Sequence, residues 1–534
     1  MFDVVLFTDT AEFSTKTRGY GMHRLATHLR ERGYSCIVID FSSAIDYNLY
    51  KEILDLTIGS NTLVVGYSTT WMPFRMPGMP PQTMDPGRLS RRATDEQQFD
   101  QLENSKFKGT LVTAFGNGDA DTWLEYPKTL NPKTKLILGG TKIDMYMDVN
   151  LADHFVIGYA ETMMIDLLDS LSGKGKRRLF NRVIDHDQKA QAPVWNFRES
   201  KTQYQEYDFI TSQEALSLEV GRGCRFKCSY CSYPLIGQKN TNDYLKHEYI
   251  LREELLENYN KWGITRYYIM DDTFNDSTEK LQMFLNVTNS LPFKISFWCY
   301  LRLDLLAVHI EQIQMLKDMG MAQCYFGLET FHTQSSKAIG KGMSAQRRKE
   351  TLRLCKDIWG DSVNIQSGFM VGLPHESSDS IKETTDYLIE DDCPIDIAWV
   401  FPLSIAGDHE LTRYVYKSEL DRNYEKYGYY FPNPDRFWEW YKRDDTDIDS
   451  FETAERVSNE HAARIKNKPY RGNFYKASLN HPILSNRELT LSMTDEQYEE
   501  LINSIDLSDL FYKTVMEDYF NPLLMFLKSK KQTL

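Results

Sequence analysis

Three cysteines in one short loop are the residues whose types and spacing most directly indicate chemistry. Residues 220–231 read Val-Gly-Arg-Gly-Cys-Arg-Phe-Lys-Cys-Ser-Tyr-Cys, so Cys224, Cys228 and Cys231 follow one another at spacings of four and three. The alternating, largely apolar run 215–220 that leads into them indicates a strand. Four thiolates would close a metal site, whereas three on one tight loop leave a 4Fe–4S cluster with an iron that lacks a protein ligand. Such an open iron can act on a bound molecule.

Two other readings of the same cysteines stay open at this point. A structural zinc site needs a fourth ligand, and the nearest candidate is His247, sixteen residues beyond Cys231 in an expected helix. A disulfide with one spare thiol would suit a secreted chain, and nothing in this sequence indicates secretion. The cluster interpretation fits the spacing best.

Composition narrows the class of protein. The chain has 534 residues, of which 41% are hydrophobic, so two or three packed domains are expected. Lys and Arg number 62 against 76 Asp and Glu, and this net charge of −14 does not indicate a general nucleic-acid surface. No apolar run approaches the ~20 residues that span a bilayer. Eight cysteines without dense, even spacing indicate a reducing compartment, and we expect a cytoplasmic protein without a membrane partner.

The first third of the chain alternates between strand and helix patterns. Strands are expected at 3–8, 36–41, 62–68, 135–138 and 154–157, and helices at 20–33, 48–58 and 162–171. This order predicts an α/β domain over 1–172, with a Rossmann-like, doubly wound parallel sheet. The Met- and Pro-rich segment 71–108 interrupts it, and a lid and a solvated insertion are equally consistent with its composition. Residues 173–212 are expected to be a linker.

A second series of strand–helix units follows the linker. Strands are expected at 217–220, 267–270, 295–301, 324–328, 364–371 and 397–403. Six such units predict a partial (βα)6 barrel over 213–411, with its chemistry on the loops at the carboxyl ends of the strands. Residues 412–534 lose this rhythm, and we expect a mostly helical domain that closes the barrel mouth. The aromatic residues crowded into 424–441 fit a packed core better than a substrate site.

The cysteine spacing, with Tyr230 directly before the last cysteine, resembles the signature of the radical S-adenosylmethionine (SAM) superfamily. The resemblance implies that Cys224, Cys228 and Cys231 hold a 4Fe–4S cluster and that its open iron chelates SAM. One-electron reduction would then release a 5′-deoxyadenosyl radical. It also implies an electron donor such as a flavodoxin or a ferredoxin. The other five cysteines are scattered, so a second cluster is not expected.

Further motifs of that family follow the expected strands in the right order. Asp271 and Asp272 resemble the segment that contacts the SAM amino group, although they could equally cap the next helix. Arg302 would pair with a carboxylate, either that of SAM or that of a neighbour such as Glu329. Glu329 resembles the residue that meets the ribose or methionyl part of SAM. The adenine motif is matched by Gly368, Gly372 and Glu376, with His375 where many relatives carry glycine.

The first domain is similar to the cobalamin-binding domain that precedes many radical SAM cores. The resemblance rests on the order of four segments, 23–34, 64–70, 136–140 and 156–162, and it implies that Gly139 and Gly140 approach the corrin. No Asp-x-His-x-x-Gly occurs, so that motif supplies no histidine to cobalt. A Rossmann-like domain that only packs on the barrel is the alternative.

Together these features predict an enzyme. The leading hypothesis is cobalamin-dependent methylation of an unactivated carbon, with one SAM as radical source and a second as methyl donor. A cobalamin-free radical SAM enzyme that performs a cyclisation or rearrangement is the second hypothesis, and a non-catalytic iron–sulfur or cobalamin sensor is the third. The substrate, a small molecule or a peptide, cannot be read from the sequence.

Overall fold

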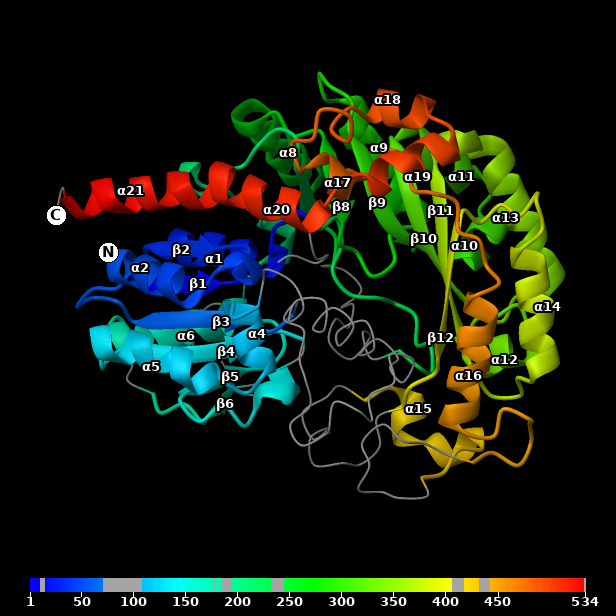
Figure 1. Ribbon diagram of the computed structural model, residues 1–534, viewed down its shortest axis with the longest axis horizontal. Helices are drawn as coiled ribbons and strands as arrows, with labels where there is room; N and C mark the ends of the chain where they lie inside the picture. The colour runs from blue at the N-terminus through cyan, green and yellow to red at the C-terminus, as the bar shows by residue number, and fades with distance from the viewer. Residues whose placement is uncertain are drawn as a thin grey trace.

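The computed structural model describes residues 1–9, 15–70, 108–141, 143–175, 178–184, 195–231, 244–405, 417–431 and 442–532. It contains two parallel six-stranded sheets, each built from consecutive strand–helix units, and a helical C-terminal region (Figure 1). The α/β fold predicted from the sequence is therefore confirmed. Most of the insertion at 71–108 lies outside the described residues.

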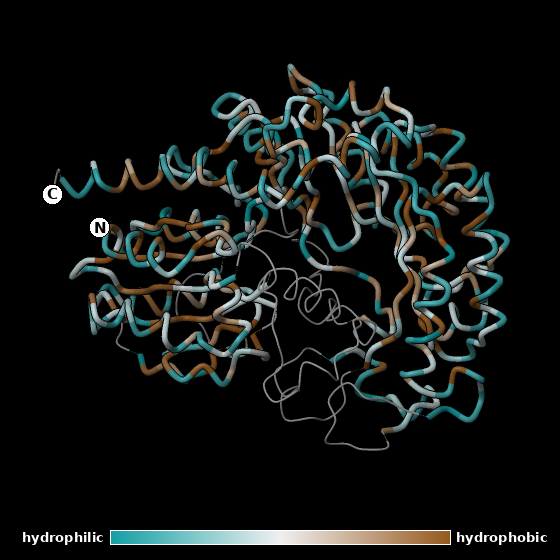
Figure 2. The backbone as a smooth tube through the Cα atoms, in the orientation of Figure 1, coloured by the Kyte–Doolittle hydropathy of each residue, from teal (hydrophilic) through white to brown (hydrophobic). Residues whose placement is uncertain are grey.

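The first sheet has the strand order β2-β1-β3-β4-β5-β6. Its strands are β1 (Val4–Phe7), β2 (Cys36–Ile39), β3 (Val64–Ser68), β4 (Lys135–Gly139), β5 (His154–Val156) and β6 (Val183–Ile184). Side chains alternate between its two faces, so Val5 and Phe7 belong to one core and Val4 and Leu6 to the other. The sheet is doubly wound, as predicted, and Figure 2 shows hydrophobic residues along its strands.

Helices cover both faces of this sheet. They are α1 (Tyr20–Glu31) and α6 (Glu161–Ser172) on one face, and α2 (Tyr47–Thr57), α4 (Leu111–Gly116) and α5 (Ala120–Leu130) on the other. Gly33 ends the α1 turn with a φ of 81°, a backbone conformation that suits glycine. β6 lies inside the segment 173–212 that was predicted to be only a linker. Two residues show no detectable alternation, so the sequence could not indicate this strand.

The second sheet is the predicted partial barrel. Its order is β12-β11-β10-β9-β8-β7, so β7 and β12 are its edges. Its strands are β7 (Ala215–Leu218), β8 (Arg266–Ile269), β9 (Ser296–Leu301), β10 (Met321–Glu329), β11 (Asn364–Val371) and β12 (Ile397–Pro402). The helices between them are α8 (Glu248–Trp262), α9 (Thr278–Asn289), α10 (Leu303–Val308), α11 (Glu311–Asp318), α12 (Thr333–Ala338), α13 (Ala345–Trp359) and α14 (Ser378–Leu388).

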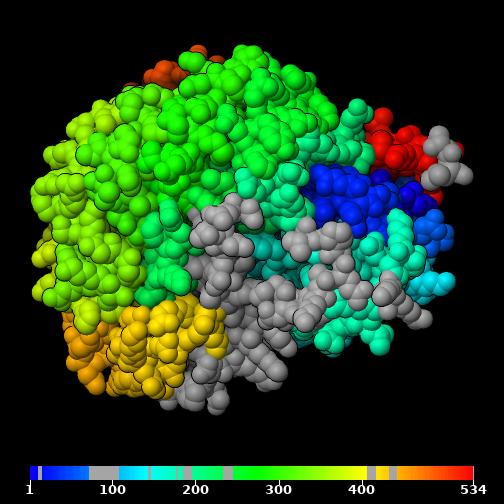
Figure 3. Space-filling view, turned by 180° about the vertical axis from the view of Figure 1, so that it is seen from behind, coloured from blue at the N-terminus to red at the C-terminus, as the bar shows by residue number. Residues whose placement is uncertain are grey.

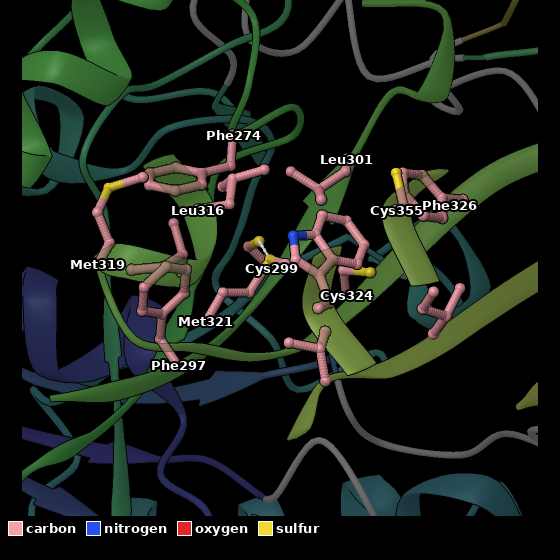
Figure 4. Packing of buried hydrophobic residues seen from close by; sticks show 14 of the residues in the cluster. Phe274, Phe297, Cys299, Leu301, Leu316, Met319, Met321, Cys324, Phe326 and Cys355 are labelled. Atoms are coloured by element: carbon pink, nitrogen blue, oxygen red, sulfur yellow. Dashed lines mark hydrogen bonds between the residues drawn. The ribbon is translucent and has the colours of Figure 1, made fainter. Parts of the chain in front are cut away.

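Between these strands and their helices lies the main barrel core. Figure 4 shows Cys299 and Cys324 packed there among Phe297, Leu316 and Phe326. Burial raises the thiol pKa of both cysteines well above its ordinary value, which makes them small apolar groups. The prediction that these two cysteines face the helices is confirmed.

The C-terminal region is mostly helical, as predicted. Its helices are α15 (Glu419–Arg422), α16 (Phe451–Ala462), α17 (Phe474–Ala477), α18 (Arg487–Ser492), α19 (Asp495–Asn503), α20 (Leu507–Val515) and α21 (Asn521–Gln532). Phe474 packs against Ala215 and Tyr268, near the amino ends of the strands and therefore opposite the cysteine loop. α20 and α21 lie against the first sheet's domain (Figures 1 and 3). The mostly helical character expected of this region is confirmed, and its helices cover three apolar surfaces, one of them at the carboxyl ends of β11 and β12.

Candidate active site

A buried carboxylate fixes the start of the cysteine loop. The Oδ1 and Oδ2 atoms of Asp271 each accept a backbone N–H at 2.8 Å, from Val220 and Gly221 respectively. Asp271 is also ion-paired with the buried Lys280. Because Asp271 is only 2% exposed and fully engaged within the protein, it does not face a ligand as the sequence motif suggested. Asp272 is the more accessible carboxylate of the pair.

The three loop cysteines are half-buried free thiols, unlike the other five, which are buried. The Sγ of Cys224 lies 3.4 Å from the Oγ1 of Thr273. The Sγ of Cys228 accepts a hydrogen bond from Nη1 of Arg302 at 3.2 Å. Arg302 thus places a cationic N–H donor directly beside a sulfur of the loop. The loop therefore suits a cluster chemically.

The zinc alternative receives no support from the structure. His247 precedes α8, where its Nδ1 lies 3.4 Å from a guanidinium nitrogen of Arg198 and its ring stacks on Tyr249. Among the residues that the structure describes, no three His, Cys, Asp or Glu side chains converge on a single ion. A fourth ligand for a zinc ion is therefore not offered by His247.

Arg302 lies beside the cysteine loop at the end of β9. Its guanidinium is held by Asp304 through two hydrogen bonds of 3.0 and 2.7 Å and lies 4.0 Å from the ring centroid of Phe226. Burial alone would lower the pKa of Arg302, but the Asp304 carboxylate and the Cys228 sulfur outweigh it and raise the pKa above its ordinary value. The salt bridge to Glu329 considered as an alternative does not form.

Glu329 reaches the loop from the end of β10. Its Oε1 accepts a hydrogen bond of 2.6 Å from the hydroxyl of Tyr230, the aromatic residue of the cysteine motif. Burial, reinforced by the charge of Glu329, raises the pKa of Tyr230 well above its ordinary value. Glu329 itself has a φ of 66°, in the left-handed region, which indicates backbone strain of the kind often found at functional sites.

Lys341 is a site residue that sequence reasoning missed. Its Nζ donates to the carbonyl of Gly327 at 2.8 Å and lies 3.7 Å from Oε1 of Glu329. A Cβ at Gly327 would lie 2.6 Å from the same Glu329 oxygen, so the glycine makes room for the carboxylate. The Lys-Gly pair after α12 carries no periodic signal, and only the fold brings it to β10.

The predicted adenine motif forms a tight turn after β11. The buried carboxylate of Glu376 accepts backbone N–H bonds from Gly372 at 2.8 Å and Leu373 at 3.1 Å, and a hydroxyl bond from Thr330 at 3.0 Å. His375 takes a φ of 64°, a left-handed conformation that favours glycine. Glu376 therefore shapes the turn from within.

Glu376 makes a testable contribution to stability. Burial raises its pKa to about 8, against the backbone and hydroxyl hydrogen bonds that lower it. The folded protein then keeps a proton that the unfolded chain releases near pH 4.5, so the free energy of unfolding falls as the pH rises from about 5 to 8. We expect Glu376→Gln, which keeps the shape without the titration, to flatten this pH dependence by a few kcal/mol. Urea unfolding of both proteins at pH 6 and pH 8.5 measures it, and parallel curves would contradict the prediction.

Gly139 and Gly140 end β4 at the carboxyl side of the first sheet. Gly140 has a φ of 116°, and a Cβ there would lie 2.7 Å from the Oγ1 of Thr70. Thr69 donates its backbone N–H to the carbonyl of Gly139 at 2.7 Å. The glycines thus allow the ends of β3 and β4 to approach each other closely. Contact of Gly139 and Gly140 with a corrin stays a prediction.

Arg222 joins this side of the first domain to the cysteine loop. It donates to Glu161, in the first turn of α6, and to Glu219, each at 2.9 Å. Its guanidinium also lies over the rings of Tyr159 and Trp195 at 4.4 and 4.5 Å. The loop after β5 therefore contacts the segment that begins the cysteine loop. Sequence reasoning missed this link because it depends on residues from three separate segments.

The parallel partial barrel thus carries three half-buried thiols after its first strand, with a cation and a carboxylate at neighbouring strand ends. Residues 218–388 match the model of the radical SAM superfamily. This match covers the barrel from β7 to α14 and confirms the resemblance read from the cysteine motif. Residues 218–388 of the barrel therefore match a radical SAM domain.

Three relatives place this domain among known proteins. An uncharacterized methyltransferase of Pyrococcus horikoshii is 22% identical over 300 residues, which are 52% of this chain and 63%, less than two thirds, of the relative. The radical SAM methyltransferase TsrM of Kitasatospora setae superposes with a TM-score of 0.53 at 14% identity, over 76% of this chain and 73% of TsrM. The cobalamin-dependent SAM radical enzyme OxsB gives a TM-score of 0.54 at 14% identity, over 100% and 81%. The two structural matches show a shared fold.

A further observation concerns helices that could span a membrane. Among the described residues, no helix has both the length and the apolar character needed to cross a bilayer.

Proposed function

We propose that this protein is a cobalamin-dependent radical SAM methyltransferase that acts on an unactivated carbon. The observation that carries the proposal is the convergence of Arg302 and Glu329 on the second half of the cysteine motif, at Cys228 and Tyr230. The sequence had assigned these two residues to SAM on motif grounds alone. TsrM, with a similar fold, is described as binding cobalamin and a 4Fe–4S cluster, which supports the same cofactor set here.

In this proposal the chain's own groups hold and orient the cofactors. Cys224, Cys228 and Cys231 would bind the 4Fe–4S cluster, which supplies electrons for SAM cleavage, while cobalamin supplies methyl transfer. Arg302, which is hydrogen-bonded to Asp304, would donate to the sulfur of Cys228 and offer its remaining N–H groups to a carboxylate. Asp272 would meet the SAM ammonium, and Glu329 the ribose or methionyl part. Gly368 and Gly372 would flank the adenine.

The first domain would hold the corrin at the carboxyl ends of its strands, beside Gly139 and Gly140. The Arg222 contact with Glu161 supports this placement, because it brings that side of the sheet to the start of the cysteine loop. We further propose a small flavoprotein or ferredoxin as electron donor, and a cytoplasmic location that suits eight free thiols.

Anaerobic purification followed by reconstitution tests the cofactor set. The protein is loaded with iron, sulfide and hydroxocobalamin and passed through a gel-filtration column. We expect about four irons and one corrin to elute with each chain. Four irons without corrin, in protein that still cleaves SAM, would favour a cobalamin-free radical SAM enzyme. Protein that binds neither would contradict the proposal as a whole.

Glu329→Gln tests the assignment of SAM to this site. The amide keeps the shape of the side chain but removes the charge, so we expect SAM binding to weaken by roughly 1–3 kcal/mol, the usual scale for a charge-assisted hydrogen bond. The visible spectrum of the cluster should remain. Glu383→Gln, on α14, is the matched control. Unchanged affinity for SAM together with a lower melting temperature would assign Glu329 to the fold alone.

A further inference from the structure

Aromatic rings line the inner side of the barrel below the cysteine loop. Because side chains alternate along a strand, the residues opposite the buried helix-facing set point into the barrel. Four of them define an aromatic wall, which crosses β9, β10 and β12: Trp298, Tyr300, Tyr325 and Trp399. Their neighbours Cys299, Cys324 and Phe326 are 0% exposed in the outer core, which confirms the opposite orientation.

The rings of the aromatic wall form one continuous surface. The centroids of Trp298 and Tyr300 are 4.4 Å apart with the rings at 77°, and those of Tyr300 and Tyr325 are 5.5 Å apart at 71°. Tyr325 and Trp399 stack at 5.8 Å and 23°. Aromatic pairs with these separations stabilise one another, so the wall is preformed.

Gly368 in β11, which has no side chain, makes this surface continuous. β11 lies between β10 and β12, and Gly368 pairs in register with Trp399. A Cβ at Gly368 would lie 2.1 Å from the hydroxyl of Tyr325. The glycine therefore lets the Tyr325 ring cross β11 and reach Trp399, a role distinct from the adenine contact expected from the motif.

The wall is closed at one end and accessible at the other. Phe474, 1% exposed, packs against Tyr268 and Trp298 toward the amino ends of the strands. By contrast, Tyr300 is 42% and Trp399 is 36% exposed. The interior of such a barrel is normally filled by side chains, so large aromatic rings that stay exposed within it mark space for a ligand.

The wall lies next to the reactive end of the barrel. Arg302, which donates to Cys228, is two residues beyond Tyr300 on β9, or about 7 Å at ~3.3 Å per residue. The charged groups that follow β9 and β10 form two ion pairs, Arg302 with Asp304 and Lys341 with Glu329. The wall itself contains only aromatic rings and tyrosine hydroxyls.

We propose that the aromatic wall binds a planar aromatic or heteroaromatic ring of the substrate and presents it to the cysteine loop. The proposal deepens the proposed function by naming the substrate class of the same site. An extended face of aromatic rings complements a flat ring, which can stack on it, whereas a saturated ring would lose the stacking. The polar substituents of the substrate would point toward the paired charges above the wall.

Binding of indole to the full, anaerobically reconstituted protein tests this inference. We expect isothermal titration calorimetry to give at least tenfold tighter binding for indole than for octahydroindole, its saturated counterpart. Trp399→Ala and Tyr300→Ala should each weaken indole binding at least tenfold, and Tyr300→Phe, which keeps the ring, should restore most of it. Tyr249→Ala removes a ring that is 59% exposed on α8 and serves as the matched control.

Any of the following three outcomes would overturn the proposal. Equal affinity for indole and octahydroindole would show apolar rather than aromatic recognition. Displacement of indole by tetramethylammonium at lower concentration would assign the wall to a cation. Unchanged binding in both alanine variants would place indole elsewhere. Iron content and SAM binding are measured on the same samples. Normal iron and SAM binding together with any of these outcomes would contradict only the aromatic substrate, whereas loss of iron or of SAM binding would contradict the proposed function.

Discussion

Replacing Cys224, Cys228 and Cys231 together with alanine is expected to remove bound iron and to abolish formation of 5′-deoxyadenosine from SAM. The three sulfurs are the half-buried thiols of the chain, and no other cysteine lies on their loop. Without them a cluster would have no protein ligand. Iron analysis and the visible spectrum after anaerobic reconstitution measure the first effect, and chromatography of the SAM products measures the second.

Cys393→Ala is the control for that experiment. Burial raises the pKa of the Cys393 thiol, which is therefore a poor iron ligand, and the variant should keep its iron and its SAM cleavage. Each single substitution in the loop should also lower iron content, since two sulfurs hold a 4Fe–4S cluster weakly. Iron at the wild-type level in the triple variant would contradict the assignment of the loop.

Arg18→Ala is expected to lower the free energy of unfolding by about 3–5 kcal/mol, the scale for breaking a buried ion pair from one side. Arg18 donates to both oxygens of Glu214, at 2.7 and 3.0 Å, and to Asp40 at 3.1 Å, and all three side chains are at most 1% exposed. Despite the burial that would raise their pKa values, Arg18 and Lys16 lower the pKa of Glu214. The contacts with His23 and Arg18 bring the pKa of Asp40 to about 2. Without Arg18, two buried carboxylates lose their principal partner.

Chemical denaturation at pH 7 measures the loss, and two further variants show its origin. Arg456→Ala, at an exposed pair on α16, should change stability by less than about 0.5 kcal/mol. Adding Glu214→Gln to Arg18→Ala should recover part of the loss, because it removes one of the unpaired charges. A loss below about 1 kcal/mol for Arg18→Ala would contradict a structural role for this pair.

The strands and the cysteine loop could be predicted from the sequence because they depend on local pattern. Apolar alternation located all six barrel strands, and the spacing of three cysteines indicated the cluster site. The side of β9 that carries Trp298, Tyr300 and Arg302 also followed from alternation alone. The sequence motif also indicated that His375 occupies a position that favours glycine.

The remaining features depend on partners that are distant in the chain. Asp271 matched a ligand motif, yet the backbone of Val220 and Gly221, fifty residues earlier, engages its carboxylate. Lys341 lies near Glu329 only because the chain after α12 comes back to the end of β10. The contact of Arg222 with α6 joins two domains that the sequence describes separately. None of these contacts has a local signal, since each arises from tertiary packing.

Helix α21 gives the protein an order of assembly that its domain layout alone would not suggest. One face of the first sheet is covered by Phe511, Tyr519, Leu523 and Leu527, each at most 1% exposed, from segments that follow the barrel in the chain. During synthesis at ~5–20 residues per second, roughly 20–70 s separate the end of α6 from the arrival of α20 on the ribosome. Throughout that time the part of this apolar core that α20 and α21 cover stays exposed beside α2, α4 and α5. A version of the first domain made alone would carry the same exposed face, and a soluble one would need α20 and α21 joined to it.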